Sequence, residues 1–153
     1  MTKNSRIDKR TIPLCVPEHS GNEWEYLKEC LDTNWVSSAG PFVGRFESGI
    51  ADYVGASYGV ATTSGTAALH VALLIAGITV NDEVLMPTLS FIAPANAIRY
   101  CGALPVFIDV EPKYWQMDID KLDNFLKHEC VRRKGKVYNS KTGRRIKAIL
   151  PVH

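Results

Sequence analysis

Apolar residues recur at helical spacing in the first third of the chain and predict two amphipathic helices there. The first lies within residues 18–33, and its apolar residues are Trp24, Leu27, Cys30 and Leu31. Ser20 and Glu23 have the spacing of a capping box and predict where this helix begins. The second helix spans residues 42–53, and Gly55 predicts its end.

Beyond residue 57, short apolar runs alternate with helical segments. Strands are predicted at residues 58–61, 83–86, 104–109 and 148–152. Helices are predicted at residues 66–76, 93–100 and 119–130, and the first of these is apolar on nearly every side, so we expect it to be buried against a sheet. Apolar strands joined by helices pair in parallel. The predicted fold class is therefore α/β, with a mostly parallel sheet and helices on both faces.

The composition is typical of one soluble globular unit. Of the 153 residues, 46% are apolar and 22% charged, close to the globular average. No signal-peptide core and no long apolar run is present, so we expect a cytoplasmic protein with no membrane partner. The cysteines form no C-x-x-C pair, which argues against a zinc site or a disulfide framework and predicts reduced, mostly buried thiols. They are Cys15, Cys30, Cys101 and Cys130.

The net charge of +2 hides an uneven distribution. Residues 127–147 contain nine Lys or Arg and the single acid Glu129, whereas the rest of the chain is acidic. This pattern excludes a uniformly basic nucleic-acid binder and leaves one local basic patch, which we expect to be solvated rather than bound to RNA. The turn-forming residues 139–143 predict a solvent-exposed hairpin, inserted at about residues 131–147 before the last strand.

The segment ATTSGTAALH, residues 61–70, leads from a predicted strand through a tight turn into a helix. The amides of Thr66 and Ala67 then point out of the helix N-terminus, where the dipole favours an anion, and Gly65 allows close approach. A plain capped helix start is the alternative. The segment is neither a Walker loop nor a G-x-G-x-x-G fingerprint.

The segment at residues 86–110 follows a strand end, where open parallel sheets bind ligands. Phe91 either lies against a flat cofactor or fills the core. Asp109 either binds a ligand or caps the turn before Pro112. His153, at the end of the last predicted strand, lies at the same edge and is placed to approach a substrate. His70 has the pattern of a satisfied core or interface histidine.

Together these segments resemble the DegT/StrS-type sugar aminotransferases, which use pyridoxal 5′-phosphate. The segments that carry the resemblance, in the order of that family, are WVSSAGPFVGRFE, YGVATTSGTAALHVAL, DEVLMPTLSFIAPANAI, YCGALPVFIDVEP and IKAILPVH. The resemblance implies that residues 1–153 form the N-terminal portion of the large domain of a fold-type-I aminotransferase. The insertion resembles the branch that aminates nucleotide-linked 4-keto sugars for legionaminic-acid-like sialic acids.

The resemblance also implies roles for particular residues. It places the cofactor phosphate on Thr66 and Ala67, next to Gly65, and stacks the pyridine ring on Phe91. The loop containing Ser37 and Ser38 lies near the substrate in such enzymes. The implied reaction transfers an amino group from an amino acid, glutamate by expectation, to a nucleotide-linked 4-keto-6-deoxy sugar for cell-surface polysaccharides. The full-length relatives are homodimers, and no metal is implied.

No catalytic residue is assigned within this chain. In the family, the Schiff-base lysine and the aspartate that pairs with the pyridine nitrogen lie beyond the position corresponding to residue 153. None of the lysines present follows an apolar strand in a setting that would lower the pKa of an amine. We therefore expect that this polypeptide alone does not transaminate.

A flavodoxin-like electron carrier is the alternative from a different class, because its phosphate loop is also rich in Ser, Thr and Gly. That loop would follow the first strand near the N-terminus, whereas here two predicted helices precede it.

Overall fold

The computed structural model describes residues 12–13, 15–37 and 39–153. Contacts divide the chain into two units, residues 1–61 and residues 62–153, and each is described by itself. Among the described residues, no helix combines the length and the apolar character needed to cross a membrane.

The first unit contains the helices α1 (Glu23–Asp32) and α2 (Pro41–Val54). Both predicted helices are confirmed, but the capping box is wrong, because α1 begins at Glu23 after Asn22 with no side-chain cap. Gly55 ends α2 as predicted and adopts the left-handed conformation, with φ of 68°. The rings of Tyr26 and Phe42 join the two helices, with centroids 5.4 Å apart.

The strand predicted at residues 58–61 is wrong, since the backbone there forms no strand. This segment is bound by α2 instead of by a neighbouring strand. The Ala61 N–H donates to the Glu47 carboxylate at 2.9 Å. Gly59 lies so close to α2 that a Cβ would come within 2.4 Å of the Glu47 carbonyl oxygen. Only a residue without a side chain allows this contact.

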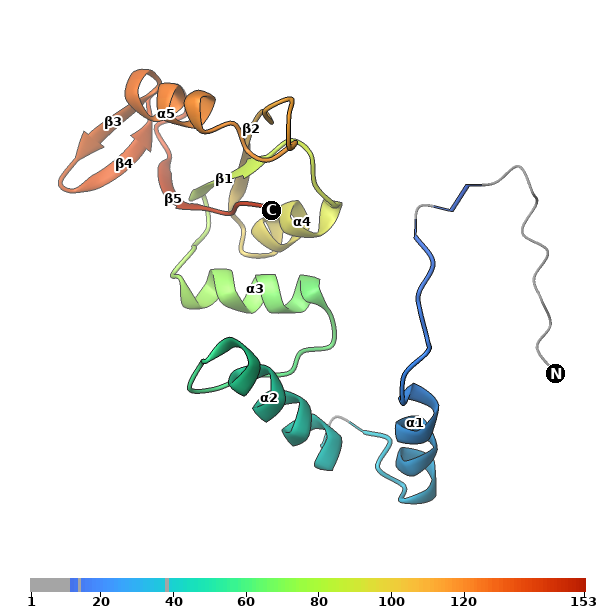
Figure 1. Ribbon diagram of the computed structural model, residues 1–153. Helices are drawn as coiled ribbons and strands as arrows, with labels where there is room; N and C mark the ends of the chain where they lie inside the picture. Colours follow the sequence, from blue (N-terminus) through green and yellow to red (C-terminus); the bar gives the residue numbers. More distant parts are fainter. Residues whose placement is uncertain (1–11, 14, 38) are drawn as a thin grey trace. The chain divides into compact units, whose positions relative to one another are not determined.

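The second unit is built around one sheet of five strands (Figure 1). Its elements in chain order are α3 (Gly65–Ile75), β1 (Glu83–Pro87), α4 (Ile92–Tyr100), β2 (Leu104–Ile108), α5 (Ile119–His128), β3 (Cys130–Arg133), β4 (Lys136–Asn139) and β5 (Arg145–Ile149). The strand order is β2-β1-β5-β4-β3. β1 is parallel to both neighbours, and β4 is antiparallel to both of its own. The α/β class is confirmed, and the sheet is mixed because the basic segment adds antiparallel strands. The last strand begins three residues before the predicted position, where Arg145 pairs with Tyr138.

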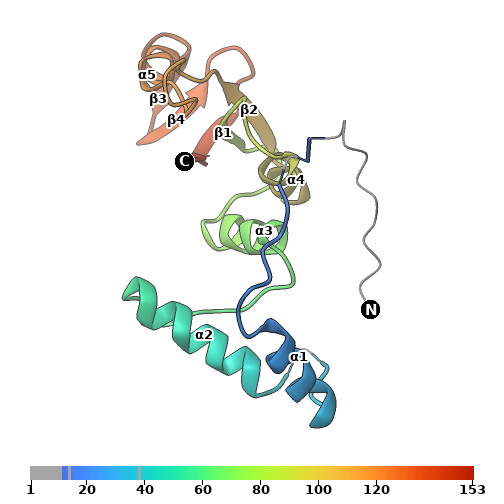
Figure 2. The ribbon, with the colours of Figure 1, turned by 45° about the vertical axis from the view of Figure 1, so that its right-hand side comes forward.

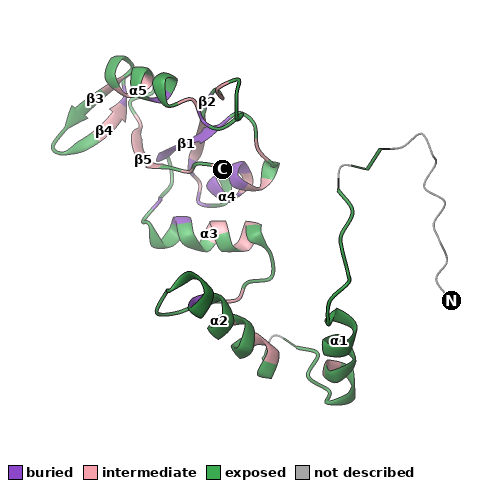
Figure 3. Cartoon of the chain, in the orientation of Figure 1, coloured by how far each residue is buried: buried purple, intermediate pink, exposed green. Residues whose placement is uncertain are grey.

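The core lies on both faces of β1, every residue of which is buried (Figure 3). Val84 and Met86 face one side and pack with Ile98 of α4. Leu85 faces the other side and packs with Leu122 of α5. Figures 1 and 2 show α5 on one side of the sheet and α4 on the other. The predicted cover of both faces by helices is therefore confirmed.

Helix α3 is less buried than its composition predicts. It packs mainly against α4, and the ring of His70 meets that of Tyr100 edge to face at 5.7 Å. Leu73 reaches the core, but Leu74 and Ile75 are exposed. The expectation of a helix buried against the sheet is wrong within the described residues, because α3 packs mainly against α4 and leaves much of its apolar surface exposed.

The basic segment forms two consecutive hairpins. Lys134 and Gly135 make a two-residue turn between β3 and β4, with φ of 49° and 73°, as two-residue hairpins require. The predicted turn at residues 139–143 joins β4 to β5 and is closed by the Gly143 N–H, which donates to the Asn139 carbonyl at 2.8 Å. Most of the segment is exposed, as predicted, but Asn139 is buried.

A buried carboxylate fixes the second turn to the central strand. Glu83, at the start of β1, is only 2% exposed. Its Oε2 accepts from Asn139 Nδ2 at 2.9 Å, and its Oε1 accepts from Thr142 Oγ1 at 2.7 Å. A buried carboxylate without partners is strongly unfavourable. The strand and the turn, 56 residues apart in the chain, therefore stabilise each other.

We predict that Asn139→Ala lowers the free energy of unfolding of the second unit by about 1–3 kcal/mol, because it removes one of the partners of a buried carboxylate. Urea denaturation followed by circular dichroism measures the change. Ser140→Ala, at an exposed position in the same turn, is the matched control and should have little effect. Equal losses in the two variants would contradict the role of Glu83.

Candidate functional site

The N-terminus of α3 carries the predicted anion site. Ser64 is its N-cap, and the Ser64 hydroxyl accepts from the Ala67 N–H at 3.2 Å. The Thr66 amide is in the first helical turn and has no carbonyl partner within the helix. An anion that uses the Ala67 amide must therefore displace the Ser64 hydroxyl, whereas the Thr66 amide and hydroxyl require no such exchange.

Phe91 lies at the N-cap position of α4, directly after the loop that leaves β1. Its side chain is 78% exposed, so the interpretation of Phe91 as a core residue is wrong. Upstream, the Thr88 N–H donates to the Ile108 carbonyl of β2 at 3.0 Å and fixes the start of this loop. The ring is thus presented at the carboxyl end of the parallel strands, where such sheets bind ligands.

A hollow of about 370 Å³ opens beside Phe91. Its lining comes from the chain that follows β1, β2 and β5 and consists of Leu89, Ser90, Phe91, Tyr114, Trp115, Gln116, Val152 and His153. The sequence placed Phe91 and His153 at this edge, and both line the hollow. It did not single out Tyr114 and Trp115, although two adjacent aromatic residues after a strand end were a usable signal.

Internal hydrogen bonds hold the loop that carries these two aromatic residues. The Glu111 carboxylate accepts from the backbone N–H groups of Lys113 and Tyr114, at 2.7 and 2.5 Å. The Trp115 indole N–H donates to the Pro112 carbonyl at 3.1 Å. Desolvation acts to raise the pKa of Glu111, but these backbone donors outweigh it and lower the pKa overall. The carboxylate therefore stays ionised and keeps the loop in place.

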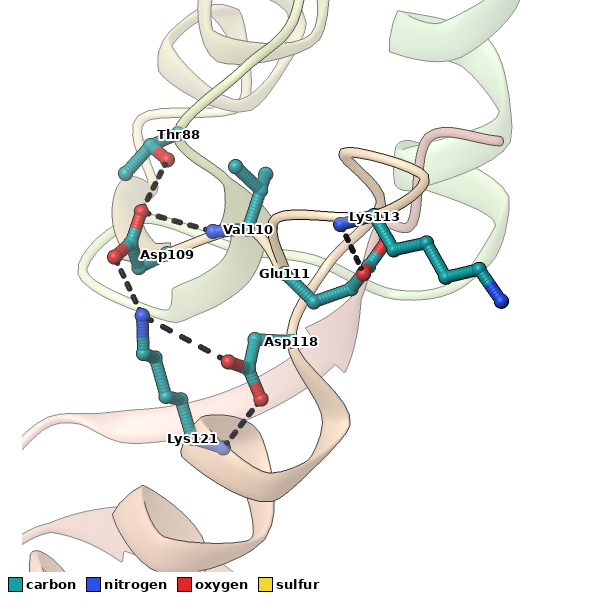
Figure 4. A network of polar contacts seen from close by, with 7 residues as sticks. All are labelled: Thr88, Asp109, Val110, Glu111, Lys113, Asp118 and Lys121. Atoms are coloured by element: carbon teal, nitrogen blue, oxygen red, sulfur yellow. Dashed lines mark hydrogen bonds and ion pairs between the residues drawn. The ribbon is translucent and has the colours of Figure 1, made fainter.

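Asp109, at the end of β2, belongs to a network of polar contacts (Figure 4). Its carboxylate accepts from Lys121 Nζ of α5 at 2.6 Å and from the Val110 N–H at 2.9 Å. The bond from Lys121 is the main cause that lowers the pKa of Asp109, and the same bond raises the pKa of Lys121. Thr88 Oγ1 lies 3.4 Å from the carboxylate. Of the two interpretations of Asp109, these contacts favour a structural cap.

The structure does not bring every predicted site residue together. Thr66 and Ala67 do not line the hollow beside Phe91. Ser37 lies in the first unit, where its hydroxyl is 3.4 Å from the Ala39 nitrogen. Ser38 lies outside the described residues. The substrate-binding role of the two serines stays a prediction.

Other reactive side chains are few in the described part of the chain. No lysine there lines the hollow beside Phe91, and no cluster of three or more His, Cys, Asp or Glu side chains is arranged to hold a metal. Cys101 is buried, and burial raises the pKa of its thiol. Cys15 is exposed, and Cys30 and Cys130 are half-buried, so the expectation of mostly buried thiols is wrong.

Comparison with known proteins gives a consistent result. The model of the DegT/DnrJ/EryC1/StrS aminotransferase family matches residues 17–153. The GDP-perosamine synthase of Caulobacter vibrioides is 40% identical over 146 residues, which are 95% of this chain and 35% of that protein. The 3-oxo-glucose-6-phosphate:glutamate aminotransferase of Bacillus subtilis is 38% identical over 97 residues, 63% of this chain and 22% of that protein.

Solved structures agree with the sequence relatives. The structure of NtdA from Bacillus subtilis with bound cofactor PMP matches with a TM-score of 0.66 and 31% identity, over 85% of this chain and 26% of that one. The chain spans about a third of the length of the curated relatives it matches first, 31–35%. These comparisons give the flavodoxin-like alternative no support.

The ion pair between Asp109 and Lys121 predicts a pH dependence of stability. The pKa of Asp109 is lower in the folded chain than the unfolded value of about 3.9. The stabilisation is therefore fully present above about pH 4 and is lost as the pH falls through the folded pKa. Asp109→Asn should flatten the acid limb of a plot of urea midpoint against pH, with only a small loss at pH 7 because the pair is exposed.

Asp123→Asn is the matched control for this measurement, since it removes an ion pair with Lys127 within α5 alone. An acid limb flattened equally by both substitutions would contradict a specific link between β2 and α5.

Proposed function

This chain belongs to the DegT/DnrJ/EryC1/StrS aminotransferase family, and from that premise we propose that it is the N-terminal portion of the large domain of a pyridoxal-phosphate-dependent sugar aminotransferase. The match over residues 17–153 carries the proposal, because it includes both the segment before α3 and the segment around Phe91. The whole protein transfers an amino group from an amino acid to a nucleotide-linked 4-keto-6-deoxy sugar for cell-surface polysaccharide.

The residues of the second unit fit pyridoxal phosphate in kind. A phosphate dianion suits the N-terminus of α3, with its dipole and the Thr66 amide of its first turn. Thr66 and Ala67 would hold the phosphate, and Gly65 leaves the approach open, since no atom lies within 4 Å of a Cβ built there. The exposed ring of Phe91 offers an apolar surface for the pyridine. When bound, the cofactor supplies the electron sink that amino-group transfer requires.

The names of the relatives support the proposed kinds of substrate. The first relative reported above is named a GDP-perosamine synthase, and the second a 3-oxo-glucose-6-phosphate:glutamate aminotransferase. We extend both to this protein in kind: a nucleotide-linked keto sugar as acceptor and glutamate as donor. Ser37 and Ser38 would lie near the sugar, and the complete enzyme would act as a homodimer.

This chain by itself does not transaminate. Transfer through pyridoxal phosphate needs a lysine amine beside the ring, with a pKa low enough to react. Of the described lysines, seven are exposed and Lys147 is half-buried on β5. The part of the chain described here supplies phosphate binding, ring stacking and loop positioning.

We predict that Thr66→Val weakens pyridoxal phosphate binding about tenfold or more, because it removes a hydroxyl donor to a charged phosphate. Ser64→Ala should keep the affinity or raise it, since it frees the Ala67 amide. Absorbance titration measures both, and Thr63→Val, at an exposed neighbouring position, is the control. Equal affinities for the Thr63 and Thr66 variants would contradict the phosphate assignment, and saturable binding of flavin mononucleotide would contradict the proposed function.

Borohydride reduction in the presence of pyridoxal phosphate tests whether any lysine of this chain forms a specific Schiff base with the cofactor. We expect weak labelling spread over several lysines, as measured by peptide mass spectrometry. Stoichiometric labelling of one lysine would show that the Schiff-base residue lies within this chain.

A further inference from the structure

Trp115 has an unusual backbone for so large a residue. Its φ is +61°, in the left-handed region that bulky residues rarely adopt. Three other non-glycine residues share a positive φ among those described: Asn34, Asn81 and Lys134. Asparagine tolerates this region, and Lys134 lies in a two-residue hairpin turn that requires it. Trp115 instead closes the turn that begins at Glu111, whose carbonyl accepts from the Trp115 N–H at 3.1 Å. A residue as bulky as tryptophan is rare at such a position, and backbone strain of this kind is found at functional sites.

The strained turn presents the indole to the hollow instead of burying it. Trp115 is 65% exposed, and its indole N–H is already bonded to the Pro112 carbonyl, so a face of the ring is its available surface. Tyr114 lines the same hollow and is also exposed. Gln116 adds an amide, which both donates and accepts hydrogen bonds.

A cation completes this group of side chains. Lys113 Nζ lies 4.7 Å from the centre of the Tyr114 ring. Figure 4 shows its side chain extending away from the Asp109 and Lys121 pair, and within the described residues no carboxylate forms an ion pair with it. One short loop thus offers an aromatic face, an amide and an unpaired ammonium.

We propose that the loop of residues 113–116 binds the nucleoside diphosphate of the sugar substrate, with the base stacked on Trp115 and the diphosphate near Lys113. This inference rests on the proposed function for the identity of the substrate. An aromatic ring stacks with any nucleobase, because every base has a π-face. The Gln116 amide would form hydrogen bonds with the edge of the base, and the Lys113 ammonium would bind the negatively charged diphosphate. Phe91 remains the proposed surface for the pyridine of the cofactor.

The test uses the full 153-residue chain with Trp24→Phe and Trp35→Phe, so that Trp115 is the sole tryptophan. GDP and UDP are titrated separately and the fluorescence of Trp115 is followed. We expect saturable quenching by at least one of them. Trp115→Gly, followed by calorimetry, should weaken binding about 5- to 150-fold, and its unfolding midpoint should be kept or raised because glycine relieves the positive φ.

Two further variants separate stacking from charge. Trp115→Phe should recover most of the affinity, because it keeps an aromatic face. Lys113→Gln should weaken GDP or UDP binding and reduce the salt dependence of that binding. It should leave the affinity for the free nucleoside, which has no phosphate, unchanged. Unchanged nucleotide affinity in Trp115→Gly, or equal losses in Trp115→Gly and Trp115→Phe, would overturn the proposal.

Titration with pyridoxal phosphate distinguishes this inference from the proposed function. The proposed function expects Phe91→Ala to weaken pyridoxal phosphate binding and Trp115→Gly to leave it unchanged. Quenching of Trp115 by pyridoxal phosphate but by neither nucleotide would assign the indole to the cofactor and overturn the inference alone. Absence of pyridoxal phosphate binding in the parent chain would count against the proposed function. Quenching of Trp115 fluorescence by GDP or UDP would still support nucleotide binding by the loop of residues 113–116.

Discussion

The complete burial of β1 is the constraint on which the second unit depends. Five consecutive buried residues can pair their backbone groups only with strands on both sides, and β2 and β5 supply these pairs in parallel. The side chains of β1 alternate between the core under α4 and the core under α5. Its first residue, Glu83, is buried and takes its hydrogen-bond partners from a turn far away in the sequence.

That constraint also places the candidate site. Parallel strands end at one edge of a sheet, so the chain leaving β1, β2 and β5 converges there. Phe91 and the loop of residues 113–116 lie together at this edge. The contact between Thr88, which follows β1, and Asp109, which follows β2, holds the ends of these two strands close together. The contacts that hold this edge, between Asp109 and Lys121 and around Glu111, are exposed and polar. The sheet is therefore held by buried contacts, whereas the loops at its edge are held by exposed polar contacts.

The two ends of the sheet differ in chemistry. At the carboxyl end the exposed groups are aromatic rings, an amide and His153. At the opposite end, the turn of residues 139–143 is fixed to Glu83 and brings a strongly basic hairpin into the sheet. Arg133 and Lys136 lie directly opposite each other on β3 and β4, an arrangement that like charges disfavour. The buried contacts at its base and the pairing of β4 with β5 together keep the hairpin in place.

Sequence periodicity alone determined the helices, the strands β1 and β2, the α/β class and the position of Phe91, because apolar spacing and turn residues act locally. It failed at residues 58–61, where a strand-like segment is bound by a helix, and on α3, whose apolar surface is only partly covered. The turn residues at 139–143 also predicted the hairpin of β4 and β5, whereas tertiary structure decided the pairing of β3 with β4, the partners of Glu83 and the exposure of Trp115. Each depends on contacts between residues far apart in the chain or on a backbone angle, and neither leaves a periodic signal in the sequence.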